Sequence, residues 1–285
     1  MDTSPNFNVP DSSLKVTAQA GRPVLGDFLQ ITLFSEGDFE PLMTFALQKV
    51  ADLERALDLE DPKSEISKLI SLQGDDTSEI SFFVGEVMEE ALALSILSAG
   101  AFEPFREGSK NWEMRSLIRG YIVDQTVKHL LQAEPSLMGV IHLAEGMRFF
   151  NCPKKSIHVR MGNSDIDREV GLFKDAVSTT EAHGSHFDQE SGTLYLQPLR
   201  HCITGKHTVS AIADDCMTAN VLTYVGLFAD AQTVRECVTE LQAQVIVFKD
   251  NGEIAEIYEG NLQTKAYSSD RRHTSLLFCD DSSKD

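Results

Sequence analysis

The chain has 285 residues, of which 42% are hydrophobic and 24% charged, and its formal net charge is −19. This length suits one large domain or two small ones, and the composition is that of an ordinary globular protein. The acidic excess argues against a nucleic-acid partner, because phosphate binding needs clustered Lys and Arg. No apolar run reaches the roughly eighteen residues that a membrane-spanning helix needs, so no membrane insertion is expected.

The N-terminus has neither the basic region nor the apolar stretch of a secretory signal, and the first cysteine is Cys152. We therefore expect a cytoplasmic protein. The five cysteines are scattered and form no C-x-x-C pair. This spacing predicts reduced, partly buried thiols rather than a disulfide framework or a zinc site.

The first half of the chain reads as strands followed by helices. Alternating apolar residues predict strands at 14–17 and 28–34, and from residue 39 to 57 the apolar spacing becomes helical. Residues 61–69 predict a turn and a short capped helix, and residues 84–98 predict a second long helix ending at Gly100. A third helix is expected from about residue 120 to residue 132.

The second half returns to strands, most clearly at 156–160 and 193–196, before two helices at 217–228 and 231–241. Residues 245–258 predict a hairpin with Asn251-Gly252 at its turn. We thus expect an α/β (mixed α+β) fold with a mixed or antiparallel sheet and packed helices. The expected organisation is a lead-in strand and loop over 1–24, one compact domain over 25–260, and a polar tail over 261–285.

Four short segments carry a resemblance to a known family. They are DPKSEISKL at 61–69, GAFEP at 100–104, RGYIVD at 119–124, and VSAIA followed by DCMTAN within 209–220. Each is unspecific alone, but in this order and spacing they resemble motifs of the ApbE family of FAD:protein FMN transferases, over roughly residues 25–258. The corresponding family segments are D-P-x-S-E-I-S-x-L, G-A-F-D-P, K-G-Y-A-V-D, and V-x-V-I-A followed by D-A-M-T-A-D.

The resemblance implies a protein that holds FAD and a magnesium ion and attaches FMN to a Thr or Ser hydroxyl of a target flavoprotein. Such chemistry needs a cation, because negative charge develops on the phosphoryl oxygens. An arginine can meet phosphate with two parallel hydrogen bonds, which suits Arg119 to this role. The residues implied to contact flavin or nucleotide are Ala101, Phe102, Glu103, Arg119, Tyr121, Thr179, Thr180 and Leu194. For Tyr121, an aromatic side chain packed in the core is the alternative.

The metal ligands implied by the resemblance are altered in this chain. The second Asp of the last motif is Asn220, the Thr one helical turn later is Tyr224, and the residue offering a backbone carbonyl is Ile118. Magnesium prefers carboxylate oxygens, whereas Asn220 supplies only a neutral oxygen and Tyr224 a phenol of high pKa. An ordinary surface or capping role is the alternative for Asn220. A His and an Asp of the family fall on Leu194 and Gln197.

Two functions therefore remain open from the sequence. One is a divergent magnesium-dependent flavin transferase. The other is a non-catalytic protein that keeps the fold as a flavin-binding or scaffold module. Outside these motifs, His183, His186 and Asp188 lie close together and offer a second candidate metal site, but the glycine and the polar residues between them favour a mobile loop.

Overall fold

The computed structural model describes residues 16–71, 80–105, 112–153, 156–160, 167–181, 186–188, 193–195, 208–249 and 253–260. Within these ranges an eight-stranded sheet runs in the order β1-β2-β3-β4-β7-β10-β11-β12, and each neighbouring pair is antiparallel. The strands of this sheet are β1 (Ala18–Val24), β2 (Asp27–Leu33), β3 (Gly139–Leu143), β4 (Gly146–Phe150), β7 (Ala176–Glu181), β10 (Thr208–Ala213), β11 (Gln244–Phe248) and β12 (Ile254–Glu259).

Two short strand pairs and six helices complete the described part of the fold. The pairs are β5 (Ser156–Arg160) with β6 (Asp167–Gly171), and β8 (His186–Asp188) with β9 (Thr193–Tyr195). The helices are α1 (Glu40–Leu57), α2 (Glu65–Ser71), α3 (Phe82–Leu97), α4 (Trp112–Ala133), α5 (Cys216–Phe228) and α6 (Ala231–Glu240). Among the described residues, no helix is both long enough and apolar enough to cross a bilayer.

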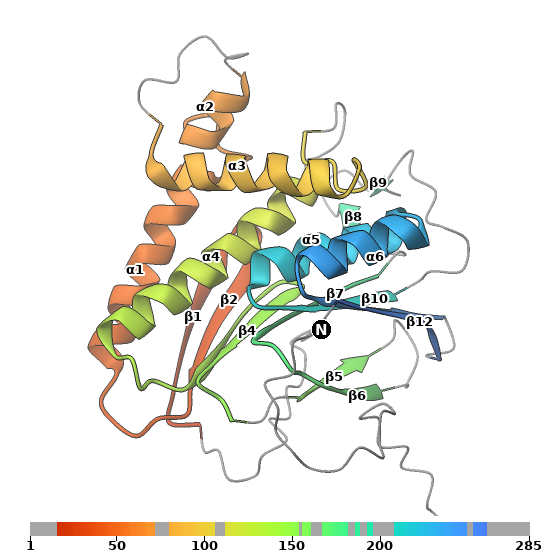
Figure 1. Ribbon diagram of the computed structural model, residues 1–285. Coiled ribbons are helices and arrows are strands. Elements are labelled where there is room, and N and C mark those ends of the chain that lie inside the picture. Colours follow the sequence, from red (N-terminus) through yellow and green to blue (C-terminus); the bar gives the residue numbers. More distant parts are fainter. Residues whose placement is uncertain are drawn as a thin grey trace, which may run out of the picture.

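Helices cover one face of the sheet, and the pair β5–β6 lies on the other side (Figure 1). Because successive side chains of a strand point to opposite faces, β4 contributes to both. Phe150 belongs to the large core between sheet and helices, while Met147 and Phe149 belong to a smaller cluster that includes Val170 of β6. The helix-covered face is the one that carries the candidate site.

Several sequence predictions are confirmed by the elements observed. The strand expected at 28–34 is β2, the helix expected from residue 39 is α1, and the helix expected to end at Gly100 is α3, with Gly100 at φ +77°. Strands β11 and β12 pair antiparallel as the hairpin prediction requires. Residues 250–252 at its turn, and the predicted tail 261–285, lie outside the described residues.

Two predicted elements are corrected. The first described strand, β1, begins at Ala18, so Val16 and Thr17, the described part of the strand predicted at 14–17, lie outside it. Helix α4 begins at Trp112, about two turns before the predicted start at residue 120. Gly120 marked that start because glycine weakens helices, yet here it lies inside one. A Cβ on Gly120 would lie 2.5 Å from the Met217 Cα, so the glycine is what allows α4 and α5 to touch.

Candidate functional site

The contact between α4 and the first turn of α5 builds the candidate site. The Asp124 carboxylate on α4 accepts hydrogen bonds from the backbone N–H groups of Cys216 and Met217, both at 2.9 Å. It also pairs with Arg148 of β4 at 2.7 Å. Burial raises the pKa of Asp124 to about 6, although Arg148 and the two N–H donors act in the opposite direction. Asp215 caps α5 by accepting from the Thr218 N–H, so two carboxylates hold this helix terminus.

Asn220 lies one turn further along α5 and is fully buried. Its Nδ2 donates to the Ser116 backbone carbonyl of α4 at 2.7 Å, and its Oδ1 accepts from the Cys216 thiol at 3.8 Å. A carbonyl can only accept, so the nitrogen of the amide must face Ser116. Gly146 closes the remaining side, because a Cβ there would lie 2.5 Å from Oδ1. Asn220 is therefore neither a surface residue nor a cap.

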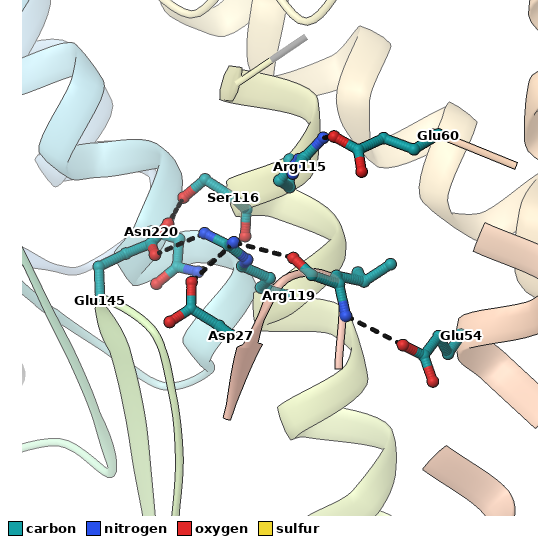
Figure 2. Close-up of polar contacts among 9 residues, drawn as sticks. Asp27, Glu54, Glu60, Arg115, Ser116, Arg119, Glu145 and Asn220 are labelled. Carbon is teal, nitrogen blue, oxygen red and sulfur yellow. Dashed lines mark hydrogen bonds and ion pairs between the residues drawn. The ribbon is translucent and has the colours of Figure 1, made fainter. Parts of the chain in front are cut away.

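A network of charges surrounds the same stretch of α4 (Figure 2). Arg119, with only about a tenth of its side chain exposed, pairs with Asp27 at 2.8 Å and with Glu145 at 3.4 Å. It also donates to the Leu25 carbonyl at 3.0 Å. Glu145, from the turn between β3 and β4, accepts the Ser116 hydroxyl. We call Asp27, Ser116, Arg119, Glu145 and Asn220 the Arg119 cluster.

The other residues implied as metal ligands lie nearby but face the core. Tyr224 is buried, and burial raises the pKa of its phenol well above the usual value, with Glu145 and Glu113 adding to the effect. Ile118 is fully buried within α4. The carbonyl that meets Asn220 belongs to Ser116, two residues before the one predicted.

These residues do not fit a magnesium ion. Mg²⁺ takes oxygen ligands in near-octahedral geometry, but the Asn220 amide donates its N–H to the Ser116 carbonyl, and its Oδ1 accepts from the Cys216 thiol. The Tyr224 phenol stays protonated, so it brings no negative charge. Within the parts of the chain that the structure describes, no group of three His, Cys, Asp or Glu side chains could hold a metal.

Hydrogen bonds within the protein engage three of the residues implied to contact flavin or nucleotide, Tyr121, Thr179 and Thr180. Tyr121 is buried and donates its hydroxyl to Glu86 of α3 at 2.6 Å. Burial, reinforced by Glu86, raises the pKa of Tyr121. On β7, Thr179 shares a hydrogen bond with Ser210 and Thr180 shares one with Thr223, each at 2.8 Å.

The segment after α3 reaches the same end of α4. Phe102 is fully buried and its backbone N–H donates to the Ser98 hydroxyl at 3.0 Å, while Ala101 is half-buried and Glu103 exposed. The Glu103 N–H donates to Glu113 in the first turn of α4. The motif positions at 101–103 thus lie beside those on α4. Leu194 lies in β9, where only the backbone is described.

Two members of the Arg119 cluster carry no sequence signal of their own. Ser116 lies in the turns of α4 that precede the predicted start, and Asp27 follows the tight turn at Leu25 and Gly26, whose φ angles are positive. Among the candidates outside the motifs, His186 and Asp188 lie in β8 and His183 lies outside the described residues.

The structure also has a hollow of about 490 Å³ along the C-terminal half of α4. Its lining includes Asp124, Lys128, Leu131 and Arg148, and it includes none of the residues implied to contact flavin. This volume lies within the range of small-molecule pockets. None of its lining residues belongs to the Arg119 cluster.

No protein-family model and no curated protein sequence matches the chain. Solved structures of flavin transferases do match it in fold. The ApbE protein of Thermotoga maritima aligns with a TM-score of 0.65 at 17% identity, covering 86% of this chain and 97% of that one. The flavin transferase ApbE of Vibrio cholerae gives 0.63 at 13% identity, covering 86% and 97%. The apo flavinyl transferase ApbE of Pseudomonas stutzeri gives 0.63 at 15% identity, covering 87% and 95%. This chain therefore has the fold of the ApbE flavin transferases.

Proposed function

We propose that this chain is a binding protein built on the flavin-transferase fold, and that it does not carry out magnesium-dependent transfer of FMN. The hydrogen bond from the Asn220 amide to the Ser116 carbonyl carries the proposal. At the position where the resemblance implies a metal-bound carboxylate, the side chain bonds directly to α4. A neutral N–H donor at this position joins the two helices by a direct hydrogen bond.

The charges of the Arg119 cluster support the same conclusion. The Arg119 guanidinium pairs with the two carboxylates of Asp27 and Glu145, so these three groups together carry a formal charge of −1. A pyrophosphate approaching Arg119 would meet these carboxylates without a cation to offset them. Phosphoryl transfer depends on positive charge at this point, so the cluster disfavours it.

Transfer of FMN from FAD to a target flavoprotein is the second candidate function. Arg119 occupies the position that the resemblance assigns to phosphate contact, and Asp124 keeps the motif carboxylate that fixes the start of α5. Release of Arg119 from Asp27 and Glu145 would free its guanidinium for an anion. Magnesium and FAD remain the cofactors implied for this activity.

The test is to incubate the purified chain with FAD, MgCl₂ and an acceptor protein that the positive control modifies, because transfer of FMN needs a hydroxyl to receive it, and to follow AMP release by chromatography. An active ApbE flavin transferase serves as the positive control, and the same mixture with a chelator serves as the blank. We expect FAD to remain intact at the level of the blank. Magnesium-dependent release of AMP would overturn the proposal in favour of the transferase.

A further inference from the structure

Helix α3 carries apolar side chains on two opposite sides. Its inner side is formed by Val84, Val87, Ala91 and Leu94, which are buried against the core. On its outer side, Phe82 is 71% exposed, Leu92 52% and Ile96 79%. Exposed apolar side chains that lie together on one surface mark a candidate interaction site.

The outer side chains form a continuous stripe. Phe82, Glu89, Leu92 and Ile96 follow one another at intervals of seven, three and four residues, so they share one face over about 21 Å of helix. We call these four residues the α3 stripe. Helix α3 lies across the ends of α1 and α4, and the short helix α2 lies beyond its N-terminal half (Figure 1). The stripe has the length and spacing of a surface for one partner helix.

The negative charge of α3 determines which kind of partner fits the α3 stripe. The helix contains Glu86, Glu89 and Glu90 and no Lys or Arg. Glu86 is held by Tyr121, whereas Glu89 is exposed within the stripe. A partner covering the stripe must therefore supply positive charge opposite Glu89 and apolar side chains opposite Leu92 and Ile96.

The α3 stripe of a second copy of this chain does not meet that requirement. In an antiparallel pairing centred on the stripe, the midpoint between residues 82 and 96 is Glu89, so the two Glu89 side chains would face each other. A parallel pairing also places each glutamate beside its own equivalent. Like charges buried at an interface cost several kcal/mol. Anionic lipid surfaces are disfavoured for the same reason, because they would repel these glutamates.

We propose that the α3 stripe docks a basic amphipathic helix of a partner protein, with a Lys or Arg against Glu89 and aliphatic residues against Leu92 and Ile96. This gives the proposed binding role a partner class and rests on that role. The two proposals fail separately, because AMP release tests the first and peptide binding the second.

The probe is a fluorescent synthetic peptide of about 14 residues, two heptads of Leu and Lys with Leu at helical spacing. A peptide of the same composition with Leu and Lys alternating serves as its control. Binding to the full chain is followed by fluorescence anisotropy. We expect the helical peptide to bind and the alternating one to bind at least about tenfold more weakly.

Variants of the chain locate the contact. We expect Leu92→Gln with Ile96→Gln to weaken binding at least about tenfold, and Glu89→Gln to weaken it while reducing its dependence on salt. Phe45→Gln is the matched control, because Phe45 is an exposed aromatic residue of α1, and it should leave binding unchanged. All of these side chains are exposed, so melting curves should show folded variants.

Four results would overturn the proposal. They are equal binding of both peptides, equal binding by the double variant, a comparable loss in Phe45→Gln, and self-association or anionic-vesicle binding that disappears in the double variant. Self-association would identify a second copy as the occupant, and vesicle binding a membrane surface. Sedimentation of the chain alone and with vesicles measures both.

Discussion

Replacing Asn220 by Asp restores the carboxylate that the resemblance implies, yet the structure predicts lower stability rather than a gained metal site. The Ser116 carbonyl would lose its buried donor, which costs about 1–3 kcal/mol. The new carboxylate would also be buried without a cationic partner, and the two losses together should lower the free energy of unfolding by about 3–5 kcal/mol. For a chain of this size we expect the melting temperature to fall by about 10 °C.

The loss should depend on pH. Burial favours the protonated acid, so the folded Asn220→Asp variant would hold its proton to a higher pH than the unfolded chain does. Its stability relative to wild type therefore falls as the pH rises from about 5 to about 8. Thermal unfolding followed by circular dichroism over this range measures the effect.

Asn151→Asp supplies the matched control. Asn151 is exposed, and its amide donates to the Pro135 and Leu137 carbonyls, both at 2.9 Å. The same chemical change there leaves a carboxylate in water, so the cost should stay at about 1–2 kcal/mol, in the range of two ordinary hydrogen bonds. The reasoning is refuted if Asn220→Asp melts like wild type. It is also refuted if millimolar MgCl₂ raises the melting temperature of Asn220→Asp and not that of Asn151→Asp.

The remaining predictions concern the residues around α4. Arg119→Met should lower the free energy of unfolding by about 3–5 kcal/mol, because it leaves Asp27 and Glu145 unpaired. In urea unfolding, adding Glu145→Gln to this variant should recover part of the loss, and strictly additive losses would contradict the prediction. The folded pKa of Asp124, about 6, exceeds its unfolded value, so this carboxyl group contributes stability below about pH 4 that is lost as the pH rises toward 6. Asp124→Asn should remove this pH dependence of stability. The stability of wild type relative to this variant should thus fall by up to about 3 kcal/mol over that range, and a rise would contradict the assignment. Gly120→Ala should lower the stability of the protein by about 1–3 kcal/mol, because the added methyl group forces α4 away from α5. Gly85→Ala places its methyl group in open space and should raise the stability by about 0.5–1 kcal/mol. Melting curves of the two variants measure both effects.

Periodicity in the sequence was sufficient for most of the fold. The apolar spacing from residue 39 identified α1 because five of its residues, Met43 to Leu57, are buried on one face. It failed at α4, where Gly120 interrupts the pattern. The reason for that glycine lies in α5, almost a hundred residues later, and a tertiary contact of this kind leaves no local signal.

The motif resemblance named several residues that the structure brings close together. Residues 101–103, Arg119 and Asn220 do lie around one end of α4 and the start of α5. Their partners could not be read from the chain, because Asp27, Ser116 and Glu145 come from three elements far apart in the sequence. The roles of the flavin and metal positions stay predictions, as do the domain boundaries.

The most direct test of the account is a crystal structure of the protein grown with FAD and Mn²⁺ in place of Mg²⁺, with anomalous data collected for manganese. We predict that the Asn220 amide lies within hydrogen-bonding distance of the Ser116 carbonyl, and that no anomalous peak stands between α4 and α5. A manganese peak ligated by Asn220 Oδ1 and a backbone carbonyl of α4 would contradict the account.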